Sequence, residues 1–123
     1  MTNNRFRDVA LILSTNKHKS PRAKVLDFLR STSAPEEIKR QIIYLSNQSV
    51  AAEADADSAS ENFKSVGQQC IAEFGKGFEN HPKYLSAMAE HARVLEERNR
   101  CHHELYDFLE QQPELCDVLL GCL

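Results

Sequence analysis

Apolar or small residues recur at alternating steps of four and three from Ile38 to Cys70, and this spacing constrains the fold more than any other feature. The positions are Ile38, Ile42, Leu45, Ser49, Ala52, Ala56, Ala59, Phe63, Val66 and Cys70. A second run begins at Leu85 and continues through Met88, Ala92, Leu95, Asn99, His102, Tyr106 and Leu109. Such spacing holds one face of an α-helix, here called a seam, against a neighbouring helix. The sequence therefore predicts two long helices with one seam each.

The first long helix has a marked start and an alanine-rich middle. Ser33 precedes Glu36 by three residues, as in a capping box. Residues 51–60 contain few large apolar side chains and, taken alone, are typical of a flexible linker. Their alanines nevertheless stay in phase with the seam before and after them. This favours one continuous helix from about 34 to 75, which Gly75 ends.

Proline and glycine mark the ends of the remaining helices. The second long helix is expected from about 82 to 111, and Pro113 then opens a short helix that Gly121 stops. Near the start of the chain, apolar residues at helical spacing predict short helices over 5–14 and 21–31. Ser20 suits the N-cap of the helix over 21–31, with a proline at its first position.

Together these elements predict an all-α fold, consisting of a long antiparallel helical hairpin that resembles a coiled coil. Residues 1–33 form a basic helical head, and residues 34–123 form the hairpin and the C-terminal helix. With 123 residues, of which 41% are hydrophobic, both parts are expected to belong to one domain. Folding the long helices back about residue 79 places Phe63 opposite Leu95. Pairing between chains instead of within one chain stays open.

Charge is distributed unevenly along the chain. Residues 1–44 carry nine Lys and Arg against four acids, whereas residues 45–123 carry six against fourteen. The basic head has a helix-turn-helix outline, so one hypothesis is a dimeric nucleic-acid-binding protein. Its candidate phosphate contacts are Lys17, Lys19, Arg22, Lys24, Lys39 and Arg40. Against it, the first turn of the following helix is acidic, with Glu36 and Glu37 where a recognition helix would meet the bases.

No pattern of reactive residues predicts an enzyme, a cofactor or a metal site. The sequence lacks GxSxG, GxGxxG, P-loop and HExxH motifs, and no feature marks a cysteine as a nucleophile. Zinc ligands on one helix face need a separation of three or four residues, which His91, Cys101, His102 and His103 do not provide. No metal site is expected within one chain, whereas a site shared across a subunit interface stays open.

The leading hypothesis is therefore a protein–protein interaction protein: an adaptor, chaperone or assembly subunit that offers helix faces to a partner. We expect it to bind another protein or itself, as a homo-oligomer and most simply as a dimer, through its apolar C-terminal residues Leu115, Val118, Leu119 and Leu123. Apolar runs near the start are too short for a signal sequence or a membrane span, so a cytoplasmic location without membrane insertion is expected.

Overall fold

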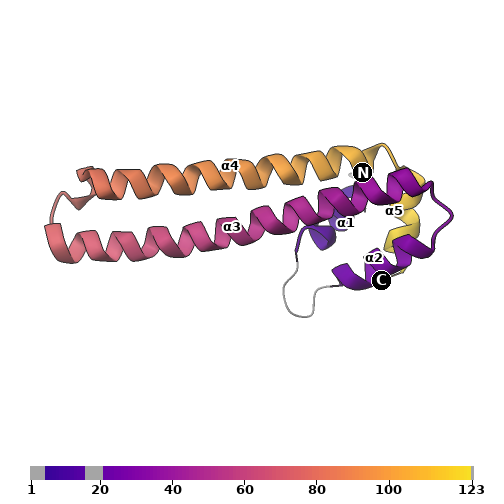
Figure 1. Cartoon of the computed structure of the whole chain (residues 1–123), viewed down its shortest axis with the longest axis horizontal. Helices are drawn as coiled ribbons and strands as arrows, with labels where there is room; N and C mark the ends of the chain where they lie inside the picture. The colour runs from indigo at the N-terminus through magenta and orange to yellow at the C-terminus, as the bar shows by residue number, and fades with distance from the viewer. Residues whose placement is uncertain (1–4, 16–20, 123) are drawn as a thin grey trace. The chain divides into compact units, whose positions relative to one another are not determined.

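The structure is a computed structural model that describes residues 5–15 and 21–122. Within these residues the chain is helical and contains no strand, which confirms the all-α prediction. The elements follow one another along the chain as shown in Figure 1, and they are α1 (Arg5–Leu13), α2 (Arg22–Ser31), α3 (Glu36–Phe74), the 3-10 helix η1 (Phe78–Asn80), α4 (Pro82–Glu110) and α5 (Pro113–Leu120).

The long helix α3 is continuous through its alanine-rich middle, which confirms the predicted single helix and excludes a linker at residues 51–60. Gly75 follows α3 with a φ of +62°, and Gly77 has a φ of +85°. Glycine adopts this left-handed conformation without a steric penalty, so Gly75 suits the end of α3 and Gly77 suits the turn that leads into η1. The chain then returns through η1, and α4 packs against α3 as a helical hairpin.

The short helices match their predictions to within one or two residues. Helix α2 begins at Arg22, with Pro21 at the N-cap position instead of the first helical position. The expected cap, Ser20, lies outside the described residues. Gly121 follows α5, but its φ of −63° is right-handed.

The chain divides into two compact units. The first unit comprises Met1–Ala51 and Arg100–Leu123, and the second comprises Ala52–Asn99. The assignment of residues 1–33 and 34–123 to one domain stays a prediction.

The first unit has a core built from α1, α2, α5, the start of α3 and the end of α4. Helix α1 packs against α2 and α5, and α2 also packs against α5. Arg5 forms an ion pair with Asp117 of α5, with 2.8 Å between Nη1 and Oδ2. Full burial of each leucine is worth about 2 kcal/mol. The buried core residues are Val9, Ala10, Leu13, Val25, Leu26, Leu29, Ile42, Leu45, Leu105, Leu109, Cys116 and Leu119.

In the second unit the seam of α3 lies where the sequence predicts it. Ala52, Ala56 and Cys70 are buried, and Ala59, Phe63 and Val66 are half-buried. The alanines therefore form part of a helix-packing face. Because they are small, they contribute little buried apolar area for the length of helix that they cover.

The seam predicted for α4 was wrong by one residue in this unit. Leu85 and Met88 were expected to face α3, but they are 42% and 43% exposed, and Asn99 is also exposed. A shift of one residue rotates a helix face by about 100°. The buried or half-buried residues of α4 in this unit are Tyr84, Ala87, His91, Val94, Leu95 and Arg98. Of these, Leu95 belongs to the predicted seam, and the other five also follow three-and-four spacing.

The predicted pairing of the two helices was wrong as well. Phe63 lies beside the rings of Tyr84 and His91, at centroid distances of 5.3 and 5.2 Å, and not opposite Leu95. His91 Nε2 also lies 2.9 Å from Ser60 Oγ. The physical reason is that Tyr84 packs its ring against Phe63 and beside Gly67 of α3, where it comes within 3.7 Å of the place that a Cβ would occupy. These contacts differ from those of the predicted register.

Candidate functional site

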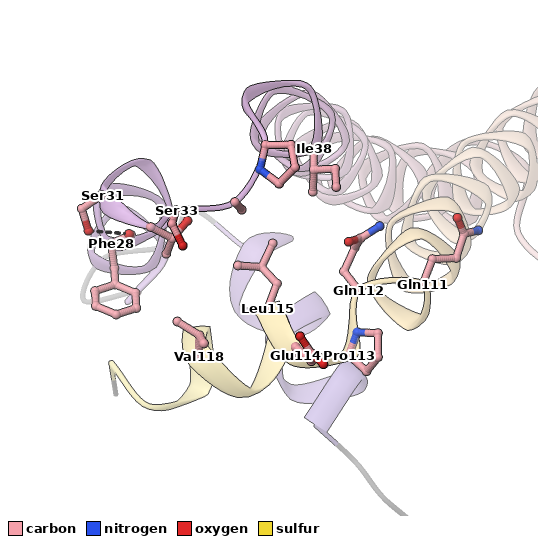
Figure 2. A pocket seen from close by; sticks show the side chains of 13 residues that line it. Phe28, Ser31, Ser33, Ile38, Gln111, Gln112, Pro113, Glu114, Leu115 and Val118 are labelled. Carbon is pink, nitrogen blue, oxygen red and sulfur yellow. Dashed lines mark hydrogen bonds between the residues drawn. The ribbon is translucent and has the colours of Figure 1, made fainter.

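A groove of about 720 Å³ opens in the first unit, next to the end of α2, the α2–α3 connection and the α4–α5 connection. Its walls come from segments that are distant in sequence. Figure 2 shows these side chains around the opening. The lining residues are Phe28, Ser31, Thr32, Ser33, Ala34, Pro35, Ile38, Gln111, Gln112, Pro113, Glu114, Leu115 and Val118.

The apolar part of the groove consists of side chains that the core does not use. Helix α5 buries Cys116 and Leu119, so Leu115 and Val118 lie beside that face at a spacing of three residues. Phe28 and Val118 remain 37% and 45% exposed. In Figure 2 these two lie at one end of the groove, Gln111 and Gln112 lie at the other, and Leu115 lies between them.

Two hydroxyl groups in the groove already donate hydrogen bonds within α2. Ser31 Oγ donates to the carbonyl of Phe28, and Thr32 Oγ1 donates to the carbonyl of Leu29, both at 2.7 Å. These bonds satisfy carbonyl groups at the C-terminus of the helix. The hydroxyls therefore stabilise the end of α2, and the Glu114 carboxylate is the charged group in the lining.

A smaller hollow of about 420 Å³ adjoins the groove and shares Pro35, Ile38 and Gln112 with it. It adds the side chains of Glu37, Gln41 and Phe108 to the lining. The surface available to a ligand thus extends from Phe28 on α2 to Phe108 on α4.

The chain matches no protein family. Comparisons with curated proteins and with solved structures gave no significant match either.

The structure separates the residues predicted to bind a partner. Leu115 and Val118 come together in the groove, whereas Leu119 has 0% exposure and belongs to the core. Leu123 lies outside the described residues. Sequence reasoning missed Phe28 and Ile38 as groove residues. A signal was present for Phe28, because α2 already buries Val25, Leu26 and Leu29 without it.

Lys39, one of the predicted phosphate contacts, is buried within the first unit. Its Nζ donates to the carbonyl of Arg30 at 3.0 Å and to Glu36 Oε1 at 3.3 Å. The side chain thereby joins the end of α2 to the start of α3 and is only 6% exposed. It does not present its charge to an external phosphate.

Arg22 is also engaged within the unit. Its Nε donates to Ser46 Oγ at 2.9 Å and its Nη2 to Asn47 Oδ1 at 2.6 Å, while Ser46 Oγ donates to the carbonyl of Leu13. Desolvation, followed by the charge of Arg30, lowers the pKa of Arg22. The remaining candidates differ, because Lys24 and Arg40 are exposed and Lys17 and Lys19 lie outside the described residues.

Among residues 5–15 and 21–122, no group of three or more His, Cys, Asp or Glu side chains is arranged to hold a metal ion. Cys101 is buried, and burial raises the pKa of the Cys116 thiol to about 11. In the same residues, no helix combines the length and the hydropathy needed to cross a membrane.

Proposed function

We propose that this chain is a small helical interaction protein that binds a segment of another protein in the groove of its first unit. The observation that carries the proposal is the exposure of Phe28 and Val118 beside Leu115 in a concave site. Exposed apolar side chains grouped in a groove are typical of protein-binding surfaces. A role as adaptor, chaperone or assembly subunit in the cytoplasm belongs to the same proposal.

Site-specific photocrosslinking in the native cell tests this proposal. A benzophenone amino acid placed at Val118 or at Phe28 should crosslink to the same partner protein. The matched control is Leu11 on α1, which is 54% exposed and does not line the groove. Binding of that purified partner, measured by calorimetry, should be lost in Val118→Asp and kept in Leu11→Asp. Crosslinks that are equally strong from Leu11 and Val118 would contradict the proposal.

Self-association is the second part of the proposal, and the second unit supports it. Leu85 and Met88 are exposed one helical turn apart on α4, and Ile71 and Phe74 are exposed on α3. Pairing with the same helices of a second copy would bury these side chains. A homodimer is the simplest such assembly.

Sedimentation velocity over a range of concentrations tests self-association. We expect a dimer whose population falls on dilution and which the double variant Leu85→Glu/Met88→Glu abolishes. The control is Tyr44→Glu, because Tyr44 is 56% exposed but lies in the first unit. A monomer at every concentration rules out this part of the proposal and leaves the groove unaffected.

We do not propose nucleic-acid binding, because Arg22 and Lys39 are held by bonds within the first unit. Lys24 and Arg40 are the exposed members of the predicted set among the described residues. Two exposed cations supply a small part of the phosphate contacts that a DNA-binding surface uses.

A further inference from the structure

We infer that the ligand of the groove is a cationic amphipathic helix of another protein, with its Lys or Arg side chains near Glu37 and Glu114. This inference rests on the proposed function, because it specifies the partner of the same groove. Three features of the first unit support it, namely the helical walls, the size of the groove and the sign of its charge.

The walls of the groove favour a helical ligand. The described part of this unit is helical and offers no sheet edge to which an extended segment could add a strand. On α5, Leu115 and Val118 form a ridge at a spacing of three residues, and Ile38 and Phe28 lie on the other elements of the lining. Ridges of this kind pack between side chains at positions i, i+3, i+4 and i+7 of a second helix.

The size of the groove limits what it can take. Its volume of about 720 Å³ falls within the usual range for sites that bury a ligand of a few side chains. One face of a short helix can place its apolar side chains there. A whole folded domain would instead need a broader interface.

The charge of the lining selects among helices. Glu114 lines the groove and Glu37 lines the adjoining hollow, while none of the lining residues is Lys, Arg or His. Neither carboxylate forms an ion pair with a described residue. A cationic ligand would pair with both groups, whereas an anionic ligand would be repelled by them.

The charged and apolar side chains of the lining lie beside one another. On α5, Glu114 precedes Val118 by four residues, so the two lie on one face of the helix. Figure 2 shows Glu114 beside Pro113, between Val118 and Gln112. Glu37 belongs to the adjoining hollow, which shares Gln112 and Ile38 with the groove. The ligand should therefore carry its positive charge directly beside its apolar contact face.

Three synthetic helical peptides provide the test. All three carry leucines at positions i, i+3, i+4 and i+7 on an alanine-rich helix, and their flanking residues are Lys, Gln or Glu. Fluorescence anisotropy measures the affinity of each peptide for the full chain at low salt. The variants are Glu37→Gln/Glu114→Gln and Val118→Asp. A control variant, Glu61→Gln/Glu79→Gln, changes the net charge equally at exposed positions of the second unit.

We expect the Lys peptide to bind about tenfold more tightly than the Glu peptide, because an exposed ion pair contributes up to about fivefold in affinity. This preference should fall below about twofold in Glu37→Gln/Glu114→Gln and persist in the control variant. Val118→Asp should weaken binding of the Lys and Gln peptides.

The other outcomes separate this inference from the proposed function. If the three peptides bind equally well and Val118→Asp weakens all of them, the charge selection is wrong and the proposed function stands. If Val118→Asp changes the binding of none of the three peptides, the inference and the proposed function are both wrong. If no peptide binds, the helical ligand is wrong, and the crosslinking experiment decides the proposed function separately.

Discussion

Lys39 illustrates how a single residue can have a different role from the one that charge patterning suggests. A buried ammonium group destabilises a protein unless hydrogen-bond partners replace its hydration. Lys39 has two such partners, the carbonyl of Arg30 and the carboxylate of Glu36. The sequence predicted Lys39 as a phosphate contact because it stands next to Arg40 in a basic region. Its position in the sequence does not show that the side chain is buried.

Replacing Lys39 by methionine keeps an apolar stem and removes the charge. We expect Lys39→Met to lower the free energy of unfolding by about 1–3 kcal/mol, because the bonds to Arg30 and Glu36 are lost. Arg40→Met is the matched control at an exposed neighbouring position. It should change the free energy of unfolding by less than about 0.5 kcal/mol. Urea unfolding followed by circular dichroism measures both. Equal effects would show that Lys39 has no structural role.

Cys116 predicts a specific dependence of stability on pH. Burial raises the pKa of its thiol from 9.0 to about 11, and the thiol also contacts the carbonyl of Leu109. Below pH 9 the thiol is mostly protonated in the folded protein and in the unfolded chain. Between about pH 9 and 11 the unfolded chain loses this proton first, so stability falls as pH rises.

At pH 10.5 this effect amounts to about 2 kcal/mol of unfolding free energy relative to pH 8. Cys116→Ala should therefore lose less stability than the parent chain over this interval, as measured by urea unfolding at each pH. Cys122→Ala, which removes a half-buried thiol, serves as the control. Identical pH dependence in Cys116→Ala and the parent would contradict the role of burial.

At the scale of elements, helix α4 shows that periodicity can predict a helix without identifying the face that packs against its neighbour. It carries two adjacent stripes at three-and-four spacing, one through Leu85 and Met88 and one through Tyr84 and Val94. Both stripes contain large apolar residues, so spacing alone did not distinguish them. The choice depends on contacts between residues distant in sequence, such as that of the Tyr84 ring with Phe63 and Gly67.

Replacing Gly67 or Gly75 by alanine should change the free energy of unfolding in opposite directions. A Cβ at this position would lie 3.7 Å from the Tyr84 ring, an ordinary contact distance. Gly67→Ala should raise the free energy of unfolding by about 0.5–1 kcal/mol through helix propensity. Gly75→Ala should lower it by about 1 kcal/mol, because φ there is +62°. Thermal unfolding measures both, and destabilisation by Gly67→Ala would show that the Tyr84 ring leaves no room for a Cβ at this position.

At the scale of the whole molecule, local signals predicted the helices and long-range contacts determined the rest. Helix-forming spacing with proline and glycine at the ends gave α3, α4 and α5 to within a few residues. The apolar C-terminal segment of the sequence predicted Leu115 and Val118 as binding residues, and both line the groove. Phe28 and Ile38 were not predicted, because their place in the groove depends on how α2 and α3 pack in the first unit.

The two units also differ in what their interiors contain. The first buries leucines from all five α-helices, whereas the buried residues of the second are Ala52, Ala56, Cys70 and Val94. Smaller buried area means a smaller free energy of local opening. We expect backbone amides in residues 52–99 to exchange with deuterium faster than those of the core residues Leu13, Leu29 and Leu105. Mass spectrometry of exchanged peptides measures this, and slower exchange throughout residues 52–99 would contradict it.

The ion pair between Arg5 and Asp117 joins residues 112 positions apart in the chain. While the protein is being synthesised, Val9 and Leu13 of α1 emerge from the ribosome long before α5 can cover them. Residues 52–99, in contrast, form a compact unit from one continuous segment, which can close as soon as that segment has emerged. Helix α1 is thus synthesised before most of the residues that bury it, and its apolar side chains stay uncovered by α5 until the chain has reached Leu120.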